Sequence, residues 1–247
     1  MKAITASSMR RFGSVAPSGH GVTIPAYHPA SKGARSIFPS RVYDPDEVAR
    51  VLKTGHQSRK IGKTVAKGHR KGWPIFTLTL EERATCPRTC LMWQSCYGNN
   101  CHAAERIVAG PDLERALIAE LGALQRKHPR GFLVRLHVLG DFYSTAYVEV
   151  WREALVCFPA LHVFGFTARP RDSEIGDSVA RLTDEFGWER FAIRYSGAGE
   201  AERSADILGS GAHERAIPCP AQTGAVDCCA TCSICWASER SIGFARH

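Results

Sequence analysis

Apolar and polar residues alternate along the chain with two periodicities from about residue 74 onward. Short runs rich in β-branched and aromatic residues predict four strands, over 75–80, 132–139, 161–167 and 190–195. Apolar residues that recur every three or four positions predict helices between them, over 112–127, 146–158 and 174–186. Asp112 is placed to cap the first helix. Two shorter runs predict further strands over 216–218 and 241–246.

The order of these elements indicates the fold class. Strands that alternate with helices of about 10–15 residues are typical of βαβ crossovers and a parallel sheet. We therefore expect an α/β fold, either a partial or closed parallel α/β barrel or equally an open doubly wound sheet. The expected organisation is a basic N-terminal extension over 1–72, a barrel-like core with a cysteine loop over 73–215, and a cysteine-rich metal-binding segment over 216–247 that closes the core.

Charge is concentrated near the N-terminus. Residues 1–75 hold 14 Lys or Arg and three acids, a net charge of +11, whereas the whole chain carries +8. Residues 1–40 are rich in Ser, Gly, Ala and Pro, which predicts a mobile tail or a loosely packed strap. Residues 50–71 contain no acid, so a phosphate or nucleic-acid partner is expected there, with a solvated loop as the alternative. The candidate contacts are Arg59, Lys60, Lys63, Lys67, Arg70 and Lys71.

The chain contains ten cysteines among 247 residues. It shows neither an apolar run of about 20 residues that would span a membrane nor a secretory signal, so we expect a cytoplasmic protein without a membrane partner. Thiols stay reduced in the cytoplasm, and clustered cysteines there bind metal or perform redox chemistry more often than they form disulfides. The cysteines are therefore the first candidates for a functional site.

Nine of the cysteines fall into two groups. Cys86, Cys90, Cys96 and Cys101 follow the first predicted strand within 16 residues. Thiolates select zinc or iron–sulfur clusters, and the absence of two-residue spacings favours a cluster for this group. The second group resembles ferredoxin ligands in its spacing but also suits structural zinc; its members are Cys219, Cys228, Cys229, Cys232 and Cys235. Cys157 falls on the apolar side of a predicted helix, where we expect it in the core.

Functional groups collect at the carboxyl ends of strands in parallel α/β folds. Asp141 follows the second strong strand and is either a cap or turn residue before the next helix or a carboxylate that binds an amine, ribose or metal. Arg169 and Arg194 lie at the ends of the next two strands, where they clamp an anion or form structural salt bridges. These three residues are the catalytic candidates.

The segment IFTLTLEERATCPRTCLMWQSCYG resembles the opening of a radical S-adenosylmethionine enzyme: a first strand followed by a three-cysteine loop that ends in an aromatic residue. The resemblance implies a 4Fe–4S cluster on Cys86, Cys90 and Cys96, with one iron open to S-adenosylmethionine. It further implies cofactor contacts from Tyr97 and from the Gly140-Asp141 turn. The spacing is three then five residues, where three then two is usual, and Trp93 stands at the usual third ligand position.

A second resemblance covers residues 60–247. KIGKTVAKG, CYGNN, RLHVLGDFYS, FGFTAR and CATCSICW are similar to uncharacterised phage and prophage proteins related to the "gene product eighty-eight" group, for which no reaction is implied. Three hypotheses follow: an iron–sulfur enzyme acting on a nucleotide or nucleic acid, a zinc-stabilised nucleic-acid-binding protein without chemistry, and a transglycosylase-like enzyme with Asp141 as nucleophile.

Overall fold

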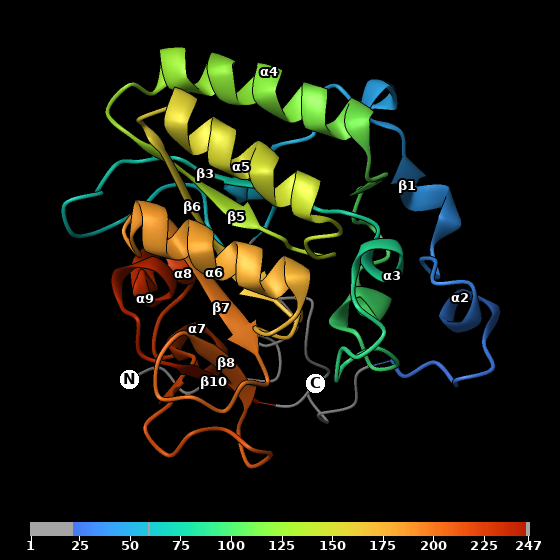
Figure 1. Ribbon diagram of the computed structural model, residues 1–247. Coiled ribbons are helices and arrows are strands. Elements are labelled where there is room, and N and C mark those ends of the chain that lie inside the picture. Colours follow the sequence, from blue (N-terminus) through green and yellow to red (C-terminus); the bar gives the residue numbers. More distant parts are fainter. Residues whose placement is uncertain (1–21, 59, 246–247) are drawn as a thin grey trace.

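The computed structural model describes residues 22–58 and 60–245, and Figure 1 shows it as a ribbon. Eight strands form one sheet in the order β2-β3-β5-β6-β7-β8-β10-β9. Their bounds are β2 Lys53–Thr54, β3 Ile75–Thr77, β5 Phe132–Leu136, β6 Leu161–Thr167, β7 Phe191–Ser196, β8 Ser204–Ile207, β9 Ile217–Pro218 and β10 Ile242–Phe244. A separate parallel pair joins β1, Val42–Tyr43, to β4, Arg106–Ile107.

The large sheet is parallel except at one edge. β2 pairs with β3 in the antiparallel sense, and every other neighbouring pair is parallel. The expected mixed α/β class with a mostly parallel sheet is therefore confirmed. Among the described residues, no ladder joins the edge strands β2 and β9, so the barrel interpretation stays a prediction.

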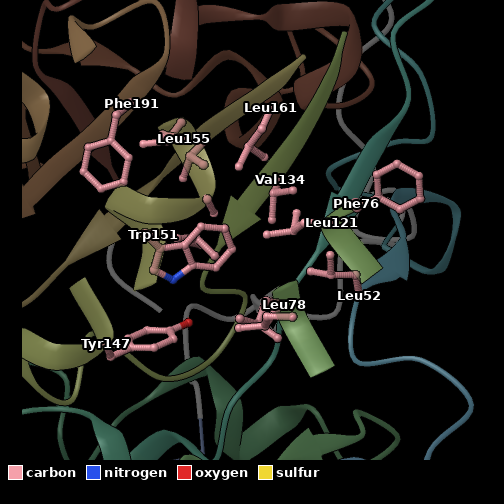
Figure 2. Packing of buried hydrophobic residues seen from close by; sticks show 14 of the residues in the cluster. Leu52, Phe76, Leu78, Leu121, Val134, Tyr147, Trp151, Leu155, Leu161 and Phe191 are labelled. Carbon is pink, nitrogen blue, oxygen red and sulfur yellow. The ribbon is translucent and has the colours of Figure 1, made fainter. Parts of the chain in front are cut away.

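Three long helices cover one face of the sheet and lie side by side in Figure 1. They are α4 Pro111–Lys127, α5 Thr145–Cys157 and α6 Glu174–Phe186. Four leucines of α4, at positions 113, 117, 121 and 124, are buried, as the three- and four-residue spacing requires. Trp151 of α5 is fully buried in the same cluster as Val134 and Leu161 of the strands (Figure 2). Its truncation to Ala would cost about 3–5 kcal/mol.

The opposite face is covered by irregular chain and three short helices. These are α7 Pro220–Thr223, α8 Cys229–Cys232 and α9 Ile234–Ala237. Alternation along β5 separates the faces: Val134 packs in the helix-side cluster, whereas Leu133 packs with Phe164, Cys235 and Trp236. Cys219 and Cys235 of the second group therefore belong to the core of this face, and Cys228 and Cys229 pack against it.

Short elements surround the first cysteine group and the N-terminal segment. They are α2 Pro29–Lys32, α3 Glu82–Thr85 and 3-10 turns at Pro39–Arg41, Pro45–Glu47, Gly55–Gln57 and Tyr97–Asn100. Residues 22–36 run against the cysteine loop; for example, the Ile24 amide donates to the Gln94 carbonyl at 3.1 Å. In the described part of the chain, no helix has the length and apolar character needed to cross a membrane.

Each predicted helix and strand has a counterpart in the structure, although β3 and β5 end three residues before the predicted limits of 80 and 139. α4 is capped by Gly110, not by Asp112, which lies in its first turn behind Pro111. Cys157 is exposed, so the prediction of a core position was wrong. It stands at the end of α5, outside the stripe formed by the helix's buried residues, Tyr147, Val148, Trp151, Ala154 and Leu155. The short strands β1, β2, β4 and β8 and the short helices α2, α3, α7, α8 and α9 were not predicted.

Candidate metal centre

The first cysteine group lies in a loop that begins at the end of α3, beside the carboxyl ends of β3 and β5. The buried Glu82 carboxylate anchors this loop. Arg106 Nε donates to one carboxylate oxygen at 2.8 Å, and Ser36 Oγ donates to the other at 3.0 Å. Both Glu82 and Arg106 are at most 1% exposed. A buried ion pair of this kind persists only when its remaining donors are also satisfied.

Arg106 and Arg83 then hold the loop by its main chain. The Arg106 guanidinium donates to the carbonyls of Gly98, Cys101 and Ala104, between 2.8 and 3.1 Å. Arg83 donates to the Trp93 carbonyl at 3.1 Å and to Asn99 Oδ1 at 2.7 Å. The loop is thus ordered by charged side chains from its two ends.

The segment over 22–36 closes the outer side of the loop. Trp93 Nε1 donates to Ser31 Oγ at 3.1 Å, and the Arg88 guanidinium donates to the Lys32 carbonyl at 2.8 Å. Arg35 forms an ion pair with Glu81 at 2.8 Å. The part of the expected extension over 22–36 is therefore a packed strap, and residues 1–21 lie outside the described residues.

Three thiols of the loop interact electrostatically. Burial raises the pKa of Cys86 well above its ordinary value, and the charges of Asp141, Cys96 and Cys90 raise it further. Burial also raises the pKa of Cys90, and it raises the pKa of Cys96 to about 12. Cys101 differs, because its charged neighbours are Arg106 and Glu82 and its Sγ faces the Tyr97 carbonyl at 3.5 Å. Cys86 therefore interacts electrostatically with both Cys90 and Cys96.

Tyr97, the aromatic residue that follows the third thiol, belongs to the same neighbourhood. Burial raises the pKa of its hydroxyl, and the charges of Cys101, Cys96 and Cys86 act in the same direction, while Arg135 opposes them. Arg135 is on β5 and projects from the face of the sheet that carries the second cysteine group, with its guanidinium 4.5 Å from the centre of the Phe166 ring. Tyr97 is therefore the point where the two groups approach one another.

Asp141 lies beside these thiols and is 2% exposed. One carboxylate oxygen accepts from the Phe142 amide and Thr167 Oγ1, and the other accepts from the Ala168 amide, each at 2.7 Å. Burial raises its pKa to about 6 in spite of these donors. Asp141 links the ends of β5 and β6, and α5 is capped instead by Ser144.

Gly140 has a conformational reason to be glycine. Its φ is +87°, and a Cβ there would stand 2.6 Å from Leu80 Cβ and 2.7 Å from Thr85 Oγ1. The turn therefore brings the backbone against α3 and delivers Asp141 to the first cysteine group.

The two candidate arginines bind main chain. Arg169 donates to the carbonyls of Phe142 and Thr85 at 2.8 and 2.6 Å. Arg194 is fully buried and donates to four carbonyls in and just after α9, those of Ile234, Ser238, Glu239 and Arg240. Burial lowers the pKa of Arg194 to about 10. Both arginines fix loops at the carboxyl edge of the sheet.

The basic segment divides into buried and exposed positions. Lys63, Lys67 and Lys71 are exposed on a hairpin in which the Val65 amide donates to the Trp73 carbonyl. Arg70 is turned inward, 3% exposed, and donates to the Glu189 carbonyl. Lys60 is half-buried and faces thiols of the second group, and Arg59 lies outside the described residues.

The second cysteine group lies under this hairpin. The amides of Cys229 and Ala230 donate to the carbonyls of Lys60 and Ile61, each at 2.8 Å. The buried thiols of Cys229 and Cys235 act on one another, which raises the pKa of Cys229 and lowers that of Cys235 to about 7. Burial raises the pKa values of Cys219 and Cys232.

The donor set of both groups is that of a thiophilic metal. Over residues 22–58 and 60–245, no three His, Cys, Asp or Glu side chains stand close enough to hold a metal ion as they are placed. Thiolate chemistry fits zinc and iron–sulfur clusters equally.

Comparison with known proteins places the chain in a family. A family model described as Gene product 88 matches residues 50–231. The chain belongs to this family. The match confirms the resemblance to the phage proteins of that name and spans both cysteine groups except Cys232 and Cys235. No curated protein and no solved structure matches the chain.

Sequence reasoning missed the residues that hold the site. Glu82, Arg83 and Arg106 were not identified, although an acid and an arginine immediately before a cysteine loop were a usable signal. Arg135 was passed over inside a predicted strand, where a charged residue in an otherwise apolar run marks a polar contact on one face.

Proposed function

We propose that the chain is a metal-binding phage-type protein with an iron–sulfur cluster on Cys86, Cys90 and Cys96, acting on a nucleotide or nucleic acid. The observation that supports it best is that Asp141 acts electrostatically on the thiols of Cys86 and Cys90 beside strand ends, the usual position of functional groups in parallel α/β folds. When bound, such a cluster supplies an electron for reductive or radical chemistry.

The residues around the thiols have distinct roles in this proposal. The Glu82–Arg106 pair fixes the loop that carries the three thiols. Asp141 and the Gly140 turn flank the open side, where the amino group of S-adenosylmethionine is expected. Tyr97 covers the side toward the second cysteine group.

The exposed lysines support the nucleic-acid part of the proposal. Lys63, Lys67 and Lys71 lie on one hairpin, and none of them forms an ion pair within the described residues. Their charge is therefore available to phosphates, whose binding releases counterions and weakens as salt rises.

Anaerobic purification tests the metal. We expect a brown protein that contains iron and sulfide and absorbs broadly at about 400 nm, as thiolate-bound clusters do. The variant with Cys86, Cys90 and Cys96 replaced by Ala should lose this centre, whereas Cys157→Ala, at an exposed cysteine, is the control and should retain it. A colourless protein that holds only zinc would favour the zinc-stabilised alternative and overturn the cluster.

Binding to DNA and RNA at several salt concentrations tests the partner. Replacing Lys63, Lys67 and Lys71 with Ala should weaken binding and reduce the salt slope by about 2–3. A matched variant that removes three exposed positive charges from the end of α4 and its loop, Arg126, Lys127 and Arg130, should bind as the unmodified protein does. Equal loss in both variants would indicate that net charge alone carries the affinity.

A further inference from the structure

We propose that the surface formed by residues 22–36 and by the first cysteine loop, residues 83–104, binds single-stranded nucleic acid. Tyr27 stacks on an unpaired base there, and Lys32 and Arg88 contact phosphates. We call this area the strap–loop surface. This role rests on the proposed function and specifies it, since the nucleic acid would be single-stranded and would lie beside the first cysteine group.

The three contact residues are brought together by hydrogen bonds between the strap and the loop. The Arg88 guanidinium of the loop donates to the Lys32 carbonyl of the strap at 2.8 Å. The Lys32 amide donates in turn to the His28 carbonyl at 3.0 Å, which leaves Tyr27 about one helical turn from Lys32. α2 and α3 lie on the same side of the molecule (Figure 1). Tyr27, Lys32 and Arg88 are therefore close together in space.

The charged side chains of the strap–loop surface are all positive. Its two segments contain four Lys or Arg and no acid. Glu81 and Glu82, which precede the loop, are both buried and already accept hydrogen bonds. Lys32 and Arg88 are exposed, and neither forms an ion pair within the described residues. The surface is therefore complementary in charge to a chain of phosphates.

Tyr27 gives this surface a ring on which a base can stack. The residue is 75% exposed, and no other Phe, Tyr or Trp of the described residues is exposed to this degree. Its side chain forms no hydrogen bond or ring contact within the described part of the chain. An aromatic ring stacks on any base, because every base has a π-face, but the base must be unpaired. Tyr27 therefore favours a single strand over a duplex.

Arg88 is held in place before any ligand binds. The carbon at the centre of its guanidinium lies 5.5 Å from the centroid of the Trp93 ring, and Trp93 is anchored by its hydrogen bond to Ser31. A guanidinium has five N–H donors, so the one hydrogen bond to the Lys32 carbonyl leaves others for a phosphate. Because the side chain is already restricted, it loses less conformational entropy when a ligand binds.

The hairpin that carries Lys63, Lys67 and Lys71 offers charge without an exposed ring. Its aromatic residue, Trp73, is half-buried, with its ring centroid 4.8 Å from that of His162. Contacts from these lysines to phosphates do not depend on whether the bases are paired. The two surfaces are therefore expected to differ, because only the strap–loop surface distinguishes a single strand from a duplex.

Fluorescence anisotropy of the full chain with a labelled oligonucleotide of mixed sequence tests this role. DNA and RNA are each measured as a single strand and as a duplex. Tyr27→Ala should weaken single-strand binding about 5- to 100-fold and leave duplex binding unchanged. Tyr27→Phe keeps the ring and should bind as the unmodified protein does, as should Val156→Ala, at an exposed apolar residue of α5. No loss in Tyr27→Ala, or equal loss for both forms, would overturn the inference.

Two further measurements separate stacking and charge from the proposed function. Lys32→Ala should lower the salt slope for a single strand by about 0.7, whereas Lys127→Ala, at an exposed residue of α4, should not change it. Inorganic polyphosphate of equal charge should displace the single strand less well than an unlabelled oligonucleotide; equal displacement would contradict stacking. If replacing the hairpin lysines abolishes binding and Tyr27→Ala does not weaken it, the inference fails and the proposed nucleic-acid partner stands. If no oligonucleotide binds, both fail.

Discussion

The two cysteine groups lie near the same sheet but are held in place by different forces. The first depends on buried charged side chains, chiefly Glu82, Arg83 and Arg106, that reach across the loop. The second depends on main-chain hydrogen bonds to residues 60 and 61 and to β10, with Arg194 closing the end of α9. A few buried charged side chains thus hold the first group, whereas several independent main-chain hydrogen bonds hold the second.

The largest expected effect is that of Arg106→Ala. The change leaves the Glu82 carboxylate buried without its partner and releases three carbonyls of the loop, so the free energy of unfolding should fall by about 3–5 kcal/mol. Urea unfolding of the anaerobic protein measures it. Arg115→Ala, which breaks an exposed pair with Asp112, should change stability by less than about 1 kcal/mol. Similar losses in the two variants would contradict the structural role of the Glu82–Arg106 pair.

Arg194→Ala should have the next largest effect and should act on the second group. The guanidinium holds four carbonyls near the end of α9, and hydrogen bonds to a charged donor contribute about 1.5–3 kcal/mol each, not additively, so we expect a loss of about 2–4 kcal/mol. Alkylation at Cys235 should accelerate more than alkylation at Cys86. A uniform acceleration at both cysteines would show global unfolding and would remove the distinction between the groups.

The contrast between the two groups also explains what could be read from the sequence. The helix-covered face was predictable because α4, α5 and α6 carry apolar residues at helical spacing and the strands between them alternate. The predicted ranges 161–167 and 174–186 match the observed bounds of β6 and α6. Periodicity indicates which side of a helix or strand is buried, and it was sufficient to predict the fold class.

The side-chain contacts around the two cysteine groups could not be predicted from periodicity. Glu82 meets Ser36 and Arg106 across 46 and 24 residues of chain, and no local pattern specifies such partners. Arg194 was placed correctly at a strand end, yet its partners are carbonyls, which every residue possesses. The strand β8 was missed because SADI mixes polar and apolar residues; its Asp206 is buried through a hydrogen bond from Ser204.

Acid should destabilise the protein through His137, which follows β5. Burial lowers the pKa of this imidazole from 6.5 to about 3, so the unfolded chain binds the proton first as pH falls. Its contribution to stability is complete above about pH 6.5 and is lost toward pH 3, by about 2 kcal/mol between pH 6.5 and 5. Urea unfolding at several pH values should give a smaller loss over this interval for His137→Gln, which retains a polar group for Tyr147. The exposed His102→Gln should follow the unmodified protein, and an unchanged slope in His137→Gln would contradict the assignment.

The smallest expected effect is the difference in stability between Gly62→Ala and Gly68→Ala. It distinguishes the cost of backbone strain from the cost of a clash with the second cysteine group. Gly62 and Gly68 both have positive φ, +85° and +74°, in the segment over 60–72. A Cβ at Gly62 would stand 2.8 Å from Cys228 Sγ and from Ala230 Cβ, whereas a Cβ at Gly68 meets nothing within 4 Å. Gly68→Ala should therefore cost only the conformational term, about 1 kcal/mol, and Gly62→Ala should cost about 1–2 kcal/mol more and shift α8. Equal losses would mean that α8 moves freely beneath the hairpin, and the main-chain contacts at residues 60 and 61 would then no longer account for the stability of the second group.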